Sequence, residues 1–329
     1  MRRRLVFLLV LTLVLSPAAA AAKKHWAAKE ITVVVQRGVL AQDAASFRPD
    51  DPLTQTELTE ALTLLELPAT GQVEAPVTMA QLDAQLVRAL GLKDTAYRFA
   101  QALRRSGLKP TSRFGAEAVA RLLGLRTNHL TVDEALELGP NEPATRAEAA
   151  FSLARVLTLD EWSLESVKAA AQSFELPAYD GRTRELLQLA TSLVGHPYVW
   201  GGMIEQRQTL FGKEVPGGFD CSGFVWRVYR SFPDLAGTLR GRTSMAMSGE
   251  VPKAQRIAID ALEPADVVFF GAKGPKSKPA QVDHMGIYLG NGWIVHSTGS
   301  TGGVALSPLT GWYAERFAWA RRPLSEVHL

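Results

Sequence analysis

A single thiol stands in the sequence GFDCSG at residues 218–223, and this residue, Cys221, is the only cysteine of the 329-residue chain. A lone cysteine excludes a disulfide within the chain. It therefore acts as a buried filler, as an intermolecular cross-link or as a reactive thiol. Composition alone favours the filler, because free cysteine is among the residue types most often buried. The residues around Cys221 favour the reactive thiol.

Apolar residues recur at helical spacing after the cysteine and predict a helix over residues 221–232. Asp220 precedes this helix and is a good N-cap residue. Cys221 then lies in the first turn, where unpaired backbone amides and the helix dipole stabilise an anion. The pattern therefore predicts a stabilised thiolate, which is the nucleophilic form of cysteine.

A nucleophile of this kind needs a base, and two of the six histidines lie on one predicted hairpin, DHMGIYLGNGWIVHSTG. If the loop holds two residues, His296 lies opposite Ile287 and His284 points to the other face. If the loop holds the three residues 290–292, His296 lies opposite Gly286 and both rings share a face, with Cβ atoms roughly 7–8 Å apart.

The apolar pattern of the hairpin favours the three-residue loop, because one face then carries a consistent core set of Met285, Ile287, Leu289, Trp293 and Val295. We therefore predict that His284 and His296 project from the same face, with Gly286 leaving room between them. A cysteine at a helix start, a histidine base and a second ring to orient that base match the logic of thiol hydrolases.

Zinc binding is the alternative use of the same side chains, since Cys221, Asp283, His284 and His296 are all ligand types. The spacing argues against it, because catalytic zinc sites recruit ligands at recognisable short spacings. We therefore expect neither a metal nor another cofactor.

The elements that hold these residues lie in the C-terminal part of the chain. An amphipathic helix follows Arg182, and strand-like runs occupy residues 266–270, 285–289, 293–297 and 317–322. Helices followed by strands predict the α+β class.

The N-terminal part repeats itself: PDDPLTQTEL at residues 49–58 is similar to PNEPATRAEA at 140–149, with a weaker copy, PVTMAQL, at 76–82. Each copy places a threonine three residues before Glu or Gln, which predicts a capping box at a helix start. The pairs are Thr54 and Glu57, Thr78 and Gln81, and Thr145 and Glu148. This part is expected to consist of short helices.

The first residues combine a basic start, MRRR, with an apolar run and an alanine-rich end. This is the pattern of a signal peptide, and the run is shorter than the roughly 20 residues that span a bilayer. We expect a secreted or wall-bound protein without a membrane span. No basic run with interleaved aromatic residues is present, so nucleic acid is not an expected partner. The predicted domains are a signal peptide (1–22), a helical repeat domain (23–160), a connector and linker (161–181) and a catalytic domain (182–329).

Two resemblances follow from these motifs. The N-terminal part resembles S-layer homology repeats, through His25–Ala27, Phe47–Pro49 and Thr145–Glu148. That resemblance implies binding to a wall-linked polymer. Residues 182–322 resemble the NlpC-type, papain-like cell-wall endopeptidases, through the stretches 197–202, 219–224, 266–270 and 284–296.

The second resemblance implies a papain-like fold with helices packed on an antiparallel sheet, and assigns roles to residues. Cys221 would be the nucleophile, His284 the base and His296 the orienting residue. Tyr198 would lie near the oxyanion, and Asp220 and Ser222 would lie beside the free amine of the substrate. The implied substrate is the peptide stem of peptidoglycan, cut next to D-glutamate or at a neighbouring bond.

Two other functions use the same sequence features: a non-catalytic wall-binding protein, and an amidase or acyltransferase with the same triad. The chain also departs from the family pattern. Residues 203–218 are longer than the usual connection and are expected to form a loop at the rim of the cleft. The glutamine expected after residues 241–244 is replaced by Met245 or Met247.

Overall fold

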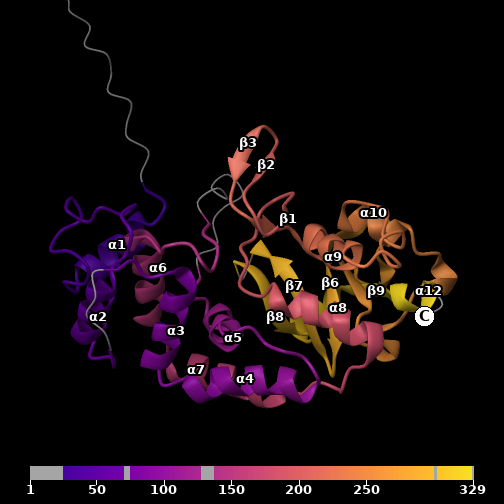
Figure 1. Ribbon diagram of the computed structural model, residues 1–329, viewed down its shortest axis with the longest axis horizontal. Helices are drawn as coiled ribbons and strands as arrows, with labels where there is room; N and C mark the ends of the chain where they lie inside the picture. The colour runs from indigo at the N-terminus through magenta and orange to yellow at the C-terminus, as the bar shows by residue number, and fades with distance from the viewer. Residues whose placement is uncertain (1–24, 70–74, 127–136, 300–301, 328–329) are drawn as a thin grey trace, which may run out of the picture.

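The chain consists of a helical N-terminal part and a C-terminal part built on an antiparallel sheet (Figure 1). A computed structural model describes residues 25–69, 75–126, 137–299 and 302–327. The predicted signal peptide at residues 1–22 lies outside these residues. The α+β class expected from the sequence is confirmed.

Helices form the N-terminal part. In chain order they are α1 (Ala28–Val35), α2 (Gln55–Leu64), α3 (Met79–Ala89), α4 (Lys93–Arg105), α5 (Phe114–Leu122), α6 (Arg146–Val156) and α7 (Glu161–Ser173). The hydroxyls of Thr54, Thr78 and Thr145 accept the backbone N–H three residues further on, at 3.2, 3.3 and 3.2 Å. Glu57 and Gln81 accept the threonine N–H in return, at 2.9 Å in both cases. The first two predicted capping boxes are therefore confirmed.

The three repeated segments meet in a closed ring of backbone hydrogen bonds, formed by the residue before each capping threonine. The N–H of Leu53 donates to Ala144, that of Ala144 donates to Val77, and that of Val77 donates to Leu53, each over 2.8 Å. Each segment gives one bond and receives one. The sequence repeat is thus a structural repeat, and its weaker copy at residues 76–82 belongs to it.

The segment between the two parts packs against both of them through buried aromatic side chains. The ring of Phe174 meets that of Trp293 edge to face, with centroids 4.9 Å apart. The N–H of Tyr179 donates to the carbonyl of Ser106 at 2.9 Å, and its hydroxyl donates to the carbonyl of Leu289. One cluster of buried apolar residues runs through both parts of the chain. The expected linker therefore fastens the helices to the sheet.

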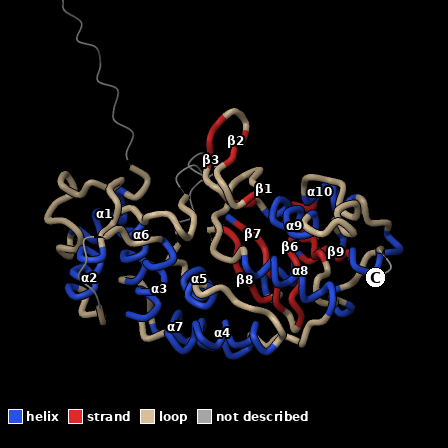
Figure 2. Tube along the Cα trace, viewed as in Figure 1, coloured by secondary structure: helices blue, strands red, loops and turns tan. Residues whose placement is uncertain are grey.

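The C-terminal sheet has five antiparallel strands in the order β8-β7-β6-β5-β9 (Figure 2). They are β5 (Val267–Gly271), β6 (Val282–Gly290), β7 (Trp293–Thr298), β8 (Gly303–Pro308) and β9 (Phe317–Arg321). The strand-like runs of the sequence correspond to all of these except β8, which the sequence analysis did not predict.

Alternate residues of the β6–β7 hairpin face two different clusters. Those facing the large cluster are Met285, Ile287, Leu289, Trp293 and Val295, which is the predicted core set. Tyr288 and Ile294 face a smaller cluster with Phe270 and Phe317. The predicted core face of the hairpin is therefore confirmed.

Further helices surround the sheet. They are α8 (Gly181–Ser192), α9 (Cys221–Arg230), α10 (Ser244–Gly249), α11 (Gly311–Arg316) and α12 (Pro323–Glu326), with 3₁₀ helices at Lys253–Gln255, Ile259–Ala261, Gly274–Lys276 and Pro279–Gln281. Helix α9 packs on β6 and β7. Because α9 begins with the cysteine and the hairpin carries both histidines, this packing places the cysteine helix on the strands that carry the histidines.

The long connection before the cysteine forms two short antiparallel pairs instead of an irregular loop. Strand β1 (Met203–Ile204) pairs with β4 (Gly218–Phe219), and β2 (Gln208–Leu210) pairs with β3 (Lys213–Val215). Figure 1 shows the β2–β3 hairpin projecting from the molecule, and Phe211 at its tip is 80% exposed.

Candidate active site

Asp220 sets the start of the cysteine helix, α9. It is the N-cap of α9, in extended conformation, and its Oδ1 accepts the N–H of Gly223 at 2.5 Å. Its Oδ2 accepts the N–H of Gly201 at 2.9 Å, which ties the preceding loop to the helix. Cys221 is the first residue of α9, so the predicted helix start is confirmed.

The environment of Cys221 differs from the sequence expectation. Burial raises the pKa of the thiol to about 12, and the charge of Asp220 adds to the rise. The backbone N–H groups of Met285, Ser222 and Cys221 itself face the sulfur and oppose the rise. The cysteine is partly exposed as a residue, yet desolvation of the sulfur outweighs the helix-start amides. The expected thiolate is therefore a neutral thiol in this structure.

The β6–β7 hairpin brings the two histidines together by a different turn from the one predicted. Ile287 pairs with Val295, so His296 lies level with Gly286, as expected. The loop, however, is the two residues Asn291 and Gly292, and the ladder shifts register between Tyr288 and Gly290. The expected three-residue loop is wrong, because a bulge at residue 289 supplies the extra residue that sets the register.

Gly286 is required by this arrangement. A Cβ atom placed on it would lie 2.9 Å from the Cβ of His296 and 3.0 Å from the carbonyl oxygen of Val295. The glycine therefore does not leave an empty space between the histidines. Its missing side chain allows β6 and β7 to approach each other closely at this point. The prediction that both rings share a face is confirmed, since Nε2 of His284 lies 2.7 Å from Nδ1 of His296.

A hydroxyl continues this relay. Nε2 of His296 lies 2.9 Å from Oγ of Ser307, which is buried on β8. The ring of Tyr313 lies edge-on to that of His296, with centroids 5.0 Å apart, and Phe270 stacks on His284 at 5.6 Å. Neither Ser307 nor Tyr313 was predicted from the sequence. Ser307 could have been found only by recognising β8 and its register with β7.

Burial keeps both histidines neutral. It lowers the pKa of His284 to about 4, while the Asp283 carboxylate opposes the shift. Burial and then the neighbouring His284 ring hold the pKa of His296 well below its usual value. The resting site thus pairs a neutral thiol with neutral imidazoles. Strand β6 carries His284 next to Met285, whose N–H faces the sulfur.

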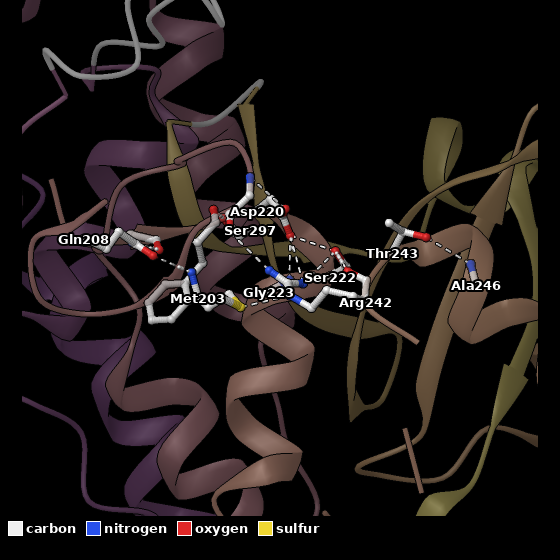
Figure 3. Close-up of polar contacts among 12 residues, drawn as sticks. Met203, Gln208, Asp220, Ser222, Gly223, Arg242, Thr243, Ala246 and Ser297 are labelled. Carbon is white, nitrogen blue, oxygen red and sulfur yellow. Dashed lines mark hydrogen bonds and ion pairs between the residues drawn. The ribbon is translucent and has the colours of Figure 1, made fainter. Parts of the chain in front are cut away.

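The predicted substrate-binding residues form a second polar group beside the helix start (Figure 3). The hydroxyl of Ser222 lies 2.8 Å from Oδ1 of Asp220 and 2.9 Å from the carbonyl oxygen of Arg242. The guanidinium of Arg242 lies 3.3 Å from Oγ of Ser222 and 4.0 Å from Oδ1 of Asp220. The guanidinium of Arg242 therefore lies beside the two residues that were predicted to face the substrate amine.

The remaining predictions for the cleft lie around this group. Tyr198 forms a parallel bridge with Phe219, two residues before the cysteine. Of the two methionines, Met247 is buried in the core and Met245 is half exposed on α10. No role was predicted for Arg242, which lies within the stretch 241–244. The structure places its side chain beside Asp220 and Ser222.

The zinc alternative finds no support in this geometry. The carboxylate of Asp283 binds Nη2 of Arg316, at 2.7 and 2.6 Å, and the two histidines bind each other. Over the described ranges, no three His, Cys, Asp or Glu side chains converge as a metal-binding group.

A family model decides the identity of this part of the chain. The model described as the NlpC/P60 family matches residues 195–322, which contain the cysteine helix and both histidines. Residues 195–322 are an NlpC/P60 domain. The S-layer homology domain model matches residues 22–59, at the first of the repeats. Both resemblances stated from the sequence are thereby confirmed.

Curated proteins are similar to part of this chain. A Bacillus subtilis (strain 168) protein, "Probable peptidoglycan endopeptidase LytE", is 36% identical over 139 residues, which is 42% of this chain and 34% of that protein. "Murein DD-endopeptidase MepH" of Escherichia coli (strain K12) is 29% identical over 48% of this chain and 54% of that protein. The chain thus spans only about a third to a half of the length of these two relatives.

Solved structures match as well. A crystal structure of an NlpC/P60 family protein from Bacillus cereus ATCC 10987 is 28% identical and covers 44% of this chain and 41% of its own, with a TM-score of 0.35. Over the residues that the structure describes, no helix is both long and apolar enough to cross a membrane.

Proposed function

We propose that this chain is a secreted cysteine endopeptidase that hydrolyses the peptide stem of peptidoglycan. Cys221 is the nucleophile, His284 the general base and His296 the residue that orients it. The observation that carries the proposal is the contact between Nε2 of His284 and Nδ1 of His296, which lie 2.7 Å apart. His284 is on β6, and the N–H of the next residue, Met285, faces Cys221, the only thiol of the chain. The names of the relatives support peptidoglycan as the substrate.

The thiol of Cys221 and the imidazole of His284 are both neutral at rest, so the first step includes a proton transfer between them. The thiol proton passes to His284 as the sulfur attacks the peptide carbonyl, so an S–C bond forms while the carbonyl oxygen gains the charge. Backbone N–H groups at the start of α9 hold this oxyanion, with Tyr198 beside it. For His284 to accept a proton on Nδ1, its Nε2–H donates to His296, whose own Nε2–H donates to Ser307.

The second half of the reaction returns the enzyme to rest. His284 gives its proton to the leaving amine as the C–N bond breaks, which leaves an acyl-enzyme on Cys221. Water attacks the thioester carbonyl and gives a proton to His284. The C–S bond then breaks, the sulfur of Cys221 takes that proton back, and the stem is released with a new carboxyl end. No metal or other cofactor takes part in these steps.

The decisive experiment digests purified peptidoglycan with the wild type and with Cys221→Ala, followed by mass spectrometry of the fragments. New peptide ends that appear with the wild type alone are expected and identify the bond. Release of whole stems from the sugar would make the chain an amidase. Identical fragment patterns for the wild type and Cys221→Ala would contradict the proposal and favour a non-catalytic wall-binding protein.

We further propose that the helical repeats attach the enzyme to the cell wall through a wall-linked polymer. The match of residues 22–59 to the S-layer homology model and the ring of three repeated segments support this. Sedimentation of the Cys221→Ala variant with cell-wall sacculi tests it without digestion. Binding is expected to sacculi that carry their polymer and to be lost when the polymer is stripped; equal binding to both would contradict the proposal.

A further inference from the structure

Helix α5 of the helical part lies beside β8 of the catalytic sheet (Figure 1). Its Arg121 is buried, and Nη2 donates to the carbonyl of Gly195 at 2.7 Å. Nη1 of the same side chain donates to the carbonyl of Gly302. One arginine thus satisfies two carbonyls of the catalytic part that burial removes from water.

The segments that carry these two carbonyls are hydrogen-bonded to each other, although both glycines lie in turns. The N–H of Gly195 donates to Val304 at 3.0 Å, and the N–H of Val304 donates to His196 at 2.8 Å. Arg121 therefore clamps the start of residues 195–198, here called the cleft segment, onto β8.

Glu137 holds the other end of the cleft segment. It is buried, and its carboxyl group accepts the backbone N–H of Tyr198. Burial raises the pKa of this carboxyl well above its usual value, with Arg121 and Arg126 opposing the shift and Glu148 adding to it. The helical part thus holds the cleft segment at both ends, through a guanidinium at Gly195 and a carboxyl group at Tyr198.

The cleft segment in turn supports the nucleophile helix. The N–H of Phe219 donates to the carbonyl of Pro197 at 3.0 Å, and the N–H of Val199 donates to the carbonyl of Phe219 at 3.2 Å. Phe219 directly precedes the N-cap Asp220. A shift of the cleft segment therefore moves both Tyr198 and the start of α9.

Gly195 shows how closely the two parts fit. Its φ is +100°, and a Cβ on it would lie 2.7 Å from Cδ of Glu117 on α5. Only glycine combines this backbone conformation with this approach.

We propose that Arg121 and Glu137, two residues of the helical part, are positioning residues of the catalytic site. They hold the cleft segment so that Tyr198 and the start of α9 face the substrate together. The proposal rests on the proposed function for its substrate, and it makes the helical part a component of the enzyme as well as an anchor.

The test compares full-length Glu137→Ala with Glu137→Gln, because the glutamine oxygen still accepts the N–H of Tyr198. A matched control is Gln188→Ala. Gln188 also bonds across the two parts, to the N–H and carbonyl of Lys109 at 2.7 and 2.9 Å, but does not touch the cleft segment. The readouts are kcat and KM on a soluble stem peptide, the melting temperature, and the rate of Cys221 alkylation by iodoacetamide.

Glu137→Ala is expected to lower kcat/KM about 10- to 100-fold, as small misplacements of catalytic groups do. Glu137→Gln should recover most of that loss, and Gln188→Ala should stay within about twofold of wild type even where its melting temperature falls. Unchanged kcat/KM in folded Glu137→Ala, or equal losses in Glu137→Ala and Gln188→Ala, would overturn the proposal.

The alkylation rate separates this inference from the proposed function. If the wild type cuts no stem peptide, the function fails, but a displaced α9 start still changes how fast iodoacetamide reaches Cys221. An alkylation rate that differs in Glu137→Ala and returns in Glu137→Gln supports the positioning role. Equal alkylation rates in the wild type and all variants, together with no cleavage of the stem peptide, would reject both the positioning role and the proposed function.

Discussion

His296 joins two strands through its ring: Nδ1 lies 2.7 Å from Nε2 of His284 on β6, and Nε2 lies 2.9 Å from Oγ of Ser307 on β8. Both ring nitrogens are therefore engaged, which fixes the orientation of a side chain that is fully buried. A histidine held in this way also fixes the ring that it contacts, so the orientation of His284 depends on Ser307 of β8.

Ser307→Ala is expected to lower kcat without unfolding the protein. It removes a hydrogen bond worth about 1 kcal/mol, which corresponds to about a fivefold loss of rate. Steady-state kinetics on a stem peptide measure the loss. Ser248→Ala is the matched control, because Ser248 is also buried and its hydroxyl donates to the carbonyl of Met245, away from the histidines. Equal kcat in the two variants would show that Ser307 does not orient His296.

Gly286→Ala is expected to separate the two strands at the histidines. The new Cβ would overlap the Cβ of His296, and such overpacking typically destabilises a protein by about 1–3 kcal/mol. Chemical denaturation measures this loss, and peptide cleavage should fall with it. Gly237→Ala serves as control, since a Cβ there meets no atom within 4 Å. A Gly286→Ala variant as stable and active as the control would contradict the close approach.

Alkylation of Cys221 reports the neutral resting thiol. Because burial raises the pKa of the thiol to about 12, the thiolate fraction grows tenfold with each pH unit through the neutral range. The rate of labelling by iodoacetamide should therefore rise steadily from pH 6 to pH 9. The chain has one cysteine, so total label counts this site alone. A plateau below pH 7 would instead indicate a stable thiolate–imidazolium pair.

Glu117 makes the stability of the protein depend on pH. Burial, and then the Asp83 carboxylate, raise the pKa of its carboxyl to about 7 from the usual 4.5. The charged groups that face it are Asp83 from α3 and the guanidinium groups of Arg113, Arg121 and Arg126. Because the folded-state pKa is raised, the stabilisation is complete below pH 4.5 and is lost as the pH rises through about 7. The loss is on the order of 3 kcal/mol.

Glu117→Gln should remove this dependence. Urea unfolding at pH 5 and pH 8 is expected to show a smaller difference in the free energy of unfolding for the variant than for the wild type. Glu165→Gln is the control, because Glu165 lies on the surface in a pair with Lys168. The same pH difference in wild type and Glu117→Gln would mean that other groups cause it.

Local patterns in the sequence determined much of the site. Capping residues and apolar periodicity placed Cys221 at the first position of a helix, because those signals act within one or two turns. Alternation along the hairpin placed His284 and His296 on one face, because a strand has a period of two. The length of the turn was predicted wrongly. The bulge at residue 289 leaves the alternation of apolar residues in both strands unchanged, so the apolar pattern could not distinguish a two-residue loop with a bulge from a three-residue loop.

The tertiary structure decided the rest. Ser307 reaches His296, and Arg121 and Glu137 reach the cleft segment, from parts of the sequence far from Cys221, so no spacing in the sequence indicates them. The protonation of the thiol also depends on the whole fold. The amides of the first turn favour a thiolate, as the sequence indicates, but the desolvation that outweighs them arises only when α9 packs on the sheet. Local sequence determines which groups are present, and packing determines their charge and their partners.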